Sequence, residues 1–156
     1  MRRVLETALE TTLPLIEESG HELDLALPDE CIPVDADPVR LSQVFANLLN
    51  NAAKYTDRGG RIPLRVERRP ASVAVSVKDT GIGISPEALP TLFEMFSQAT
   101  PALERSRGGH GIGLSLVRGV VELHGASRRT MGPKRTGPSR SRSTGERSGA
   151  SLGFGA

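Results

Sequence analysis

The sequence is short of aromatic residues and of cysteine, and both shortages limit the kind of protein it can form. Its 156 residues include no tryptophan, one tyrosine and four phenylalanines. A core therefore has to be built from leucine, valine, isoleucine and alanine. The single cysteine, Cys31, excludes a disulfide within the chain.

Long apolar runs are absent as well. No stretch reaches the roughly 18 apolar residues that a membrane-spanning helix needs. Arg2-Arg3 is followed by Val4-Leu5-Glu6 rather than by the apolar segment of a secretory signal. We therefore expect a cytoplasmic protein, or a fragment of one, whose chain makes no membrane contact.

Charge is nearly balanced, with a formal net charge of +2, and so small an excess does not indicate nucleic-acid binding. Basic residues are nevertheless concentrated in residues 127–156, a segment rich in arginine, serine and glycine that contains no valine or isoleucine. Such a composition predicts a disordered or poorly packed tail without strands. The tail is also short of the aromatic side chains of a nucleic-acid-binding arm, and we expect no nucleic-acid partner.

Helical periodicity marks two long segments near the start of the chain. Residues 3–19 carry apolar side chains on one face, and Gly20 suits the end of that helix. Asp37 and Pro38 suit the N-cap and first position of a second helix, which extends to about Tyr55. Further helices are predicted over about 86–96 and 111–124.

Alternation of polar and apolar residues predicts strands over 22–27, 61–68 and 72–78. Proline has no backbone N–H to give to a sheet, so Pro63 favours an edge position or a bulge for the second of these strands. The pattern as a whole is typical of an α/β protein with one domain over residues 1–126 and a separate tail over 127–156.

The second helix carries a polar face near its end. Asn47, Asn51 and Lys54 are spaced i, i+4 and i+7 and therefore share one side of the helix. Carboxamide oxygens suit Mg²⁺ that also carries phosphate oxygens, and the lysine ammonium lies one turn further on, where it could meet a phosphate. A solvated polar face is the alternative interpretation.

The third strand delivers Asp79 to its end, followed by Gly81 and Gly83. Two glycines let the backbone turn tightly beside a ligand. A carboxylate at this place can accept a hydrogen bond from an exocyclic amine such as adenine N6, and leaving it buried without a partner would cost on the order of 1–3 kcal/mol. The alternative is a plain Asp-Gly turn.

A glycine-rich run from Gly108 to Gly113 leads directly into the predicted helix 111–124. Free backbone amides at a helix start form a site for phosphate. The run is neither a P-loop, because no Gly-Lys-Ser/Thr follows, nor a dinucleotide fingerprint, because no strand precedes it. Arg105 and Arg107 lie just upstream and could reach phosphates, with ordinary surface charge as the alternative. In Leu92–Phe96, burial of Phe93 and Phe96 in the core is favoured over ligand contact.

Together these four motifs, in this order, resemble the N, G1, F and G2 boxes of the histidine-kinase catalytic domain. This domain belongs to the GHKL superfamily, which includes type II topoisomerases and mismatch-repair ATPases. The resemblance covers about residues 3–126. It implies a two-layer α/β sandwich of the Bergerat type, with a mixed sheet on one side, helices on the other and ATP between them under a lid.

The resemblance also implies roles for individual residues. Asn51, supported by Asn47, would hold Mg²⁺, while Lys54 and Arg105 would position phosphates and Asp79 would bind adenine. The nucleotide-binding residues implied in this way are Asn47, Asn51, Lys54, Tyr55, Asp79, Gly81, Gly83, Ile84, Phe96, Arg105, Gly109, His110, Gly111, Ile112, Gly113 and Leu114.

Two features depart from the family pattern. No phospho-acceptor domain is present, and His21 and His124 are poor candidates for the acceptor. After Ser127 the family continues with two more strands, whereas here an arginine- and serine-rich run follows, so the final strands are expected to be missing or altered. The abrupt change suggests a change of reading frame in the parent gene, which would expose an unpaired edge of the sheet.

The function predicted from these features is the ATP-binding catalytic part of a two-component sensor histidine kinase. It would act with Mg²⁺ on a histidine of a separate helical dimerisation domain, which then serves a response regulator. No nucleophile is expected within this chain. A nucleotide-binding module without turnover and an anti-sigma-type serine kinase are the alternatives.

Overall fold

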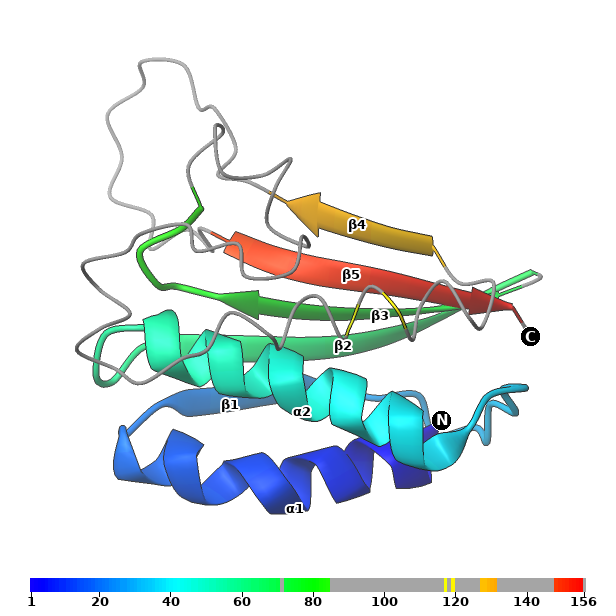
Figure 1. Ribbon diagram of the computed structural model, residues 1–156, viewed down its shortest axis with the longest axis horizontal. Coiled ribbons are helices and arrows are strands. Elements are labelled where there is room, and N and C mark those ends of the chain that lie inside the picture. Colours follow the sequence, from blue (N-terminus) through cyan, green and yellow to red (C-terminus); the bar gives the residue numbers. More distant parts are fainter. Residues whose placement is uncertain (71, 85–116, 118, 120–126, 132–147, 156) are drawn as a thin grey trace.

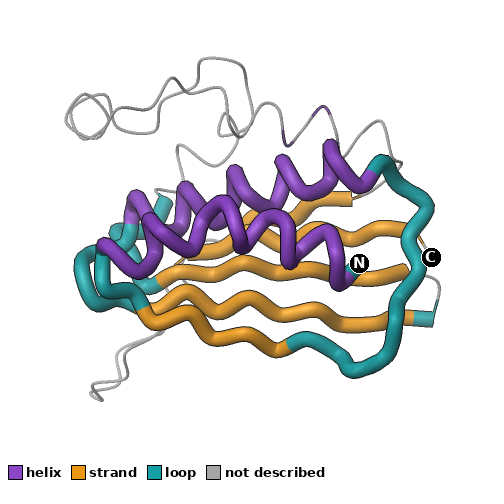
Figure 2. The backbone as a smooth tube through the Cα atoms, turned by 90° about the horizontal axis from the view of Figure 1, so that it is seen from below, coloured by secondary structure: helices purple, strands orange, loops and turns teal. Residues whose placement is uncertain are grey.

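Two helices lie side by side on one face of a five-stranded mixed sheet in the computed structural model (Figure 1). The structure describes residues 1–70, 72–84, 117, 119, 127–131 and 148–155. Figure 2 shows both helices on the same side of the sheet, which confirms the predicted two-layer sandwich. The elements are, in chain order, α1 (Arg2–Glu18), β1 (Glu22–Ala26), α2 (Pro38–Tyr55), β2 (Arg61–Arg69), β3 (Ser72–Asp79), β4 (Ser127–Met131) and β5 (Ser148–Gly155).

Both helices form where apolar residues recur along one face, and each buries that face against the sheet or the other helix. The Asp37 side chain caps α2 by accepting hydrogen bonds from the backbone amides of Val39 (2.9 Å) and Arg40 (3.2 Å). A cap of this kind stabilises a helix by about 1 kcal/mol. The buried sets are Leu5, Ala8, Leu9, Thr12 and Ile16 in α1, and Leu41, Ser42, Val44, Phe45, Leu48, Leu49, Ala52 and Ala53 in α2.

These bounds confirm the two predicted helices and the three predicted strands of the first 80 residues. The helix predicted over 86–96 lies outside the described residues. Of the helix predicted over 111–124, only Val117 and Gly119 are described, and both are helical.

The sheet has the strand order β1-β2-β3-β5-β4, with β1 parallel to β2 and the other neighbours antiparallel. Its helix-facing side carries the alternating apolar residues of β2 and β3, among them Ile62, Leu64, Val73, Val75 and Val77. All of these are buried and form one core with the inner faces of α1 and α2.

Pro63 lies in a central strand, so the expectation of an edge position is wrong. The pairing of β2 with β3 begins only at Leu64. Before the proline, the Thr80 amide donates to the Arg61 carbonyl (3.2 Å), and the Arg61 amide donates to Thr80 Oγ1 (3.0 Å). Pro63, which has no N–H to donate, therefore lies where the pairing of β2 with β3 is interrupted. Beyond this interruption, the Thr80 hydroxyl accepts from the Arg61 amide.

The tail contributes two strands, so the expectation of a tail without strands is wrong for Ser127–Met131 and Ser148–Gly155. β5 pairs with β3 over all its residues, and β4 pairs with β5. A strand needs backbone partners and an alternating pattern more than it needs β-branched residues. Ala150, Leu152 and Phe154 supply that pattern, alternating with Gly149, Ser151 and Gly153.

The sheet therefore extends past residue 126. The expectation that the final strands are missing is wrong, because β5 pairs along β3, and the change of reading frame stays a hypothesis. Residues 132–147 lie outside the described part of the chain.

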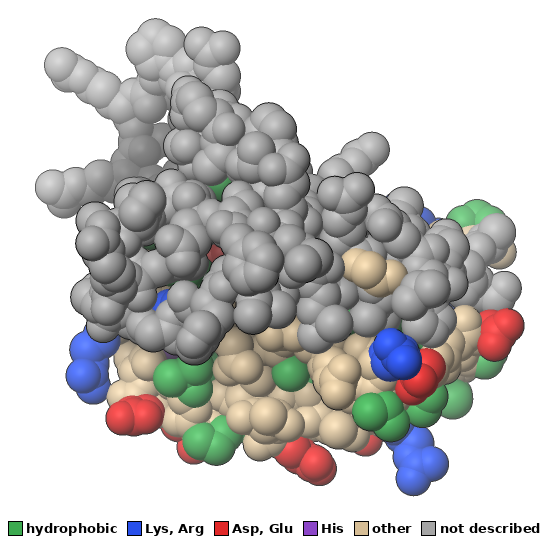
Figure 3. Space-filling model, viewed as in Figure 1, with side chains coloured by type: hydrophobic (Ala, Val, Ile, Leu, Met, Phe, Trp, Pro, Cys, Tyr) green, Lys and Arg blue, Asp and Glu red, His purple; other side chains and the backbone are tan. Residues whose placement is uncertain are grey.

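Polar and apolar side chains are interspersed on the described surface (Figure 3). Ion pairs join β2 to β1, between Arg61 and Glu22 (3.0 Å) and between Arg65 and Asp24 (3.1 Å). Since both pairs are exposed, each contributes at most about 1 kcal/mol. Among the described residues, no helix combines the length and apolar character needed to cross a bilayer.

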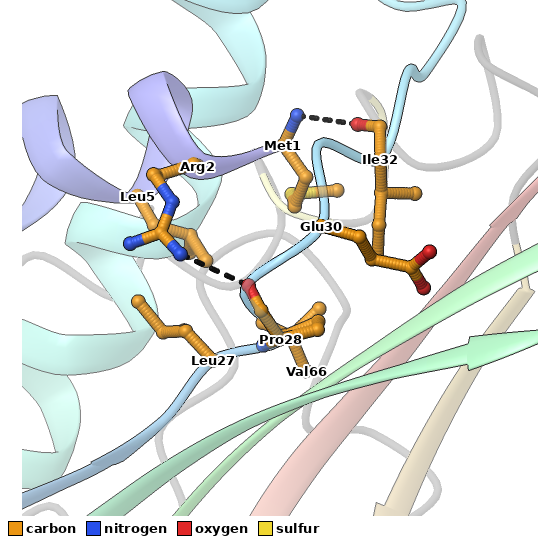
Figure 4. A pocket seen from close by; sticks show the side chains of 8 residues that line it. All are labelled: Met1, Arg2, Leu5, Leu27, Pro28, Glu30, Ile32 and Val66. Atoms are coloured by element: carbon orange, nitrogen blue, oxygen red, sulfur yellow. Dashed lines mark hydrogen bonds between the residues drawn. The ribbon is translucent and has the colours of Figure 1, made fainter.

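The start of α1 is fastened to the loop that leads from β1 to α2 (Figure 4). The α-amino group of Met1 donates to the Ile32 carbonyl (2.9 Å), and the Arg2 guanidinium donates to the Pro28 carbonyl (2.9 Å). The hollow between them has room for no more than about one water molecule. It lies near the end of β1, whereas Asp79 lies at the end of the sheet where β1 begins, so this hollow is no part of the predicted site.

Candidate functional site

The turn after β3 fixes the orientation of the Asp79 carboxylate. One of its oxygens, Oδ1, accepts a hydrogen bond from the Gly81 amide (2.9 Å), which forms the two-residue turn typical of aspartate. The carboxylate is half-buried at the strand end. Gly83 follows with a φ of 77°, a left-handed conformation that glycine adopts without strain.

This turn is joined directly to the end of α2. The Ile82 amide donates to the carbonyl of Tyr55, the last residue of the helix (3.2 Å). A Cβ atom on Gly81 would lie 2.8 Å from the Tyr55 carbonyl carbon and would overlap the carbonyl oxygen. Only glycine fits at position 81, because the turn and the helix end are in backbone contact there.

The polar face of α2 therefore ends beside the Asp79 turn. Asn47, Asn51 and Lys54 are half-buried and lie outside the fully buried stripe of the helix. The Lys54 ammonium lies 5.1 Å from the centre of the Tyr55 ring, within the range of a cation–π contact. Lys54 and Tyr55 thus lie at the same end of the sandwich as the Asp79 turn, and Asn51 and Asn47 lie about one and two turns further back in the same helix.

A second close contact, at Gly60, also joins the end of α2 to the turn after β3. Gly60, in the turn between α2 and β2, is packed so closely that a Cβ atom there would overlap the Thr56 side chain and would lie 2.9 Å from Thr80 Oγ1. The Thr80 hydroxyl in turn accepts from the Arg61 amide. Sequence reasoning missed Gly60, Thr80 and Ile82, although the pair Gly59-Gly60 and a hydroxyl residue between Asp79 and Gly81 were visible signals.

Eight of the sequence-predicted site residues are described, four in α2 and four at the end of β3 or in the turn after it. They are Asn47, Asn51, Lys54, Tyr55, Asp79, Gly81, Gly83 and Ile84. The other predicted residues lie outside the described part of the chain: Phe96, Arg105, Gly109, His110, Gly111, Ile112, Gly113 and Leu114.

Comparison with protein families gives a match over most of the chain. Residues 36–152 match the family described as histidine kinase-, DNA gyrase B- and HSP90-like ATPase. The chain belongs to this ATPase family. ATP binding follows from that membership, and the match reaches from the residue before the α2 cap into β5.

The curated relatives are histidine kinases. The histidine protein kinase DivJ of Caulobacter vibrioides is 39% identical over 124 residues, which are 80% of this chain and 21% of DivJ. The circadian input-output histidine kinase CikA of Synechococcus elongatus is 44% identical over 103 residues, 66% of this chain and 14% of CikA. The chain thus spans only about a fifth of the length of DivJ and less of CikA.

Solved structures give the same assignment for the fold. The catalytic domain of the histidine kinase ThkA superposes with a TM-score of 0.79 at 24% identity, covering 99% of this chain and 92% of that domain. Full-length ShkA in complex with AMPPNP superposes with a TM-score of 0.75 at 26% identity, covering 97% of this chain and 29% of ShkA. The chain therefore has the fold of a histidine-kinase catalytic domain, as the resemblance of its four motifs predicted.

The close contact between Gly81 and the Tyr55 carbonyl can be tested without a ligand. Gly81→Ala forces the turn away from the Tyr55 carbonyl and should cost about 1–3 kcal/mol of stability, as overpacking of a tight contact does. The hydrogen bond of the Ile82 amide should break, so exchange of that amide with solvent should accelerate beyond the change in global stability.

Gly59→Ala is the matched control. Gly59 has a φ of 76°, and a Cβ atom there would meet no atom of the described residues within 4 Å. Alanine at this site should lower the stability by about 1–2 kcal/mol through its backbone conformation alone. Exchange of the Ile82 amide should then change only as much as the global stability does. Unchanged protection of Ile82 in Gly81→Ala would contradict the contact.

Proposed function

We propose that this chain is the ATP-binding catalytic domain of a cytoplasmic two-component sensor histidine kinase. It positions Mg-ATP for phosphoryl transfer to a histidine on a separate helical dimerisation domain, from which a response regulator receives the group. The observation that carries the proposal is the joint between the Asp79 turn and the end of α2. This joint supports the proposal because a carboxylate suited to an adenine amine ends its strand beside the helix that carries the amide and ammonium groups.

The residues at this joint fit the nucleotide group by group. Asp79 has one oxygen fixed by its own turn, so its carboxylate has a defined direction in which to accept the adenine amine. Asn47 and Asn51 offer neutral hard oxygens to Mg²⁺. Lys54, one turn further on, would meet phosphate, and Tyr55 would lie near the nucleoside. Arg105 and the glycines of the run Gly109–Gly113 would complete the phosphate side.

Transfer of a phosphoryl group depends mostly on positioning and on neutralising charge, and the proposed residues serve those two tasks. The nucleophile would come from another domain. His21 is buried, and its Nε2 lies 2.9 Å from the Ala53 carbonyl oxygen, so the ring has a structural partner already. The ThkA structure solved together with the response regulator TrrA, at a TM-score of 0.77 and 21% identity, shows that this fold occurs in such assemblies.

The two alternatives raised by the sequence are weaker than the proposal. A nucleotide-binding module without turnover was suggested partly by the loss of the final strands, and those strands are present in the sheet. An anti-sigma-type serine kinase is not favoured by the relatives, which are named histidine kinases.

A transfer assay tests the proposed reaction. The purified chain is incubated with Mg²⁺, ATP labelled in its γ-phosphate and a separately purified helical hairpin that carries the acceptor histidine of a histidine kinase. We expect acid-labile, base-stable label on the hairpin, and none on a hairpin whose histidine is replaced. Acid-stable label would point to a serine kinase, and ATP binding without any label would support the module without turnover.

Asp79→Asn tests the adenine contact. Asparagine keeps an oxygen that can accept from the Gly81 amide, so the fold should be retained. The charge-assisted bond to the adenine amine would be lost, which should weaken ATP binding by about 10–100-fold in calorimetry. Asp24→Asn, which makes the same change in an exposed ion pair of the sheet, should leave ATP affinity unaltered. Equal affinity in wild type and Asp79→Asn would refute the adenine assignment.

Lys54→Ala tests the phosphate contact. Removing a cation that faces the phosphates should weaken ATP binding roughly tenfold and should leave adenosine binding nearly unchanged, because adenosine has no phosphate. Arg65→Ala removes a cation from an exposed pair between β1 and β2 and should change neither affinity. A loss that is equal for ATP and adenosine would place Lys54 away from the phosphates.

A further inference from the structure

Three turns meet at the end of the sandwich that carries the proposed site (Figure 1). The turn between α1 and β1 is bonded to the turn between α2 and β2: the Gly59 amide donates to the Ser19 carbonyl (3.2 Å), and the Glu22 amide donates to the Gly60 carbonyl (2.8 Å). The turn after β3 joins them through the bond from the Ile82 amide to Tyr55. The first of these turns contains no predicted nucleotide-binding residue, yet it is fastened to the same helix end.

His21, like Thr56 at the end of α2, is a buried polar side chain in this assembly. It is 8% exposed, and its Nε2 lies 2.9 Å from the carbonyl oxygen of Ala53, in the last turn of α2. A carbonyl oxygen can only accept, so Nε2 carries the proton and donates. Nδ1 is buried without a hydrogen-bond partner among the described residues.

The last carbonyls of a helix have no partner within the helix, and here two of them are satisfied from other segments. The Ala52 carbonyl accepts the last helical bond, from the Thr56 amide (3.1 Å), whereas the Ala53 carbonyl accepts from the His21 ring and the Tyr55 carbonyl from the Ile82 amide. The last turn of α2 is thus hydrogen-bonded to two segments. The His21 imidazole bonds to it from the turn after α1, and the Ile82 amide bonds to it from the turn after β3. Between these two fastened residues lies Lys54.

We propose that His21 is a positioning residue for the phosphate half of the nucleotide site. Its bond to Ala53 sets the place of the last turn of α2, and with it the place of Lys54 relative to the Asp79 turn. This inference rests on the proposed function, because it needs Lys54 to face phosphate. Adenine is held from β3, which lies within the sheet, so loosening the end of α2 should affect the phosphates and spare the ring.

The test compares ATP and adenosine binding by calorimetry in wild type, His21→Leu and His21→Gln, well below the melting temperature of each protein. Leucine removes the donor, and ATP affinity should fall by about fivefold to tenfold, the effect of one lost hydrogen bond, with adenosine affinity unchanged. Glutamine can place an amide N–H near the position of Nε2, and it should restore most of the ATP affinity.

A matched variant separates positioning from stability. Thr12 is fully buried in α1, and its hydroxyl donates to the Ala8 carbonyl of the same helix (3.0 Å). Thr12→Val should lower the melting temperature without changing the ratio of ATP to adenosine affinity. If His21→Leu lowers the melting temperature and leaves that ratio at the wild-type value, His21 is only structural and the inference is overturned.

The remaining outcomes are also decisive. A glutamine variant that behaves like leucine would show that the bulk of the ring matters and not its hydrogen bond, which overturns the inference as well. Should the leucine variant fail to fold, His21→Asn, whose amide is too short to reach Ala53, takes its place with the same expected loss. Failure of the wild-type protein to bind ATP would instead refute the proposed function.

Discussion

The backbone contact between the end of α2 and the turn after β3 is the constraint on which the proposed site depends. The helix supplies its last carbonyl, the turn supplies an amide, and the glycine at position 81 lets the two approach each other. Helix and strand belong to different layers of the sandwich, and their ends are joined by this contact and by the close packing of Gly60 against Thr56 and Thr80. Through these contacts, the polar face of α2 and the carboxylate of Asp79 keep a fixed relation to each other.

The same end of the helix explains why unrelated turns gather there. A helix that ends inside a protein leaves carbonyl groups that need donors. The neighbouring turns provide a backbone amide and an imidazole, and each donor that satisfies a carbonyl also fastens one more segment to the site. The hydrogen bonds that satisfy the helix end therefore also position the segments of the proposed site. The opposite end of the molecule is held differently, by the α-amino group of Met1 and the guanidinium of Arg2 on loop carbonyls.

Much of the fold could be predicted because the helices and strands follow from local sequence patterns. Asp37 and Pro38 predicted the start of α2, and the alternating valines of β3 predicted its buried side. The spacing of Asn47, Asn51 and Lys54 placed them on one face of α2. The contacts that join these elements are made by backbone groups and by His21, whose partner is 32 residues away. Nothing in the residue types identifies such partners. The final strands were missed for a related reason, because they depend on the free side of β3 rather than on β-branched residues of their own.

The two halves of the proposed site differ in how firmly they are held. Asp79 ends a strand that has neighbours on both sides in the sheet, and its carboxylate is oriented within its own turn. Lys54 belongs to the last turn of α2, whose carbonyls are held by a few hydrogen bonds from neighbouring turns, whereas Asn47 and Asn51 lie further back in the helix. Changes in those bonds should therefore alter the binding of phosphate before they alter the binding of adenine.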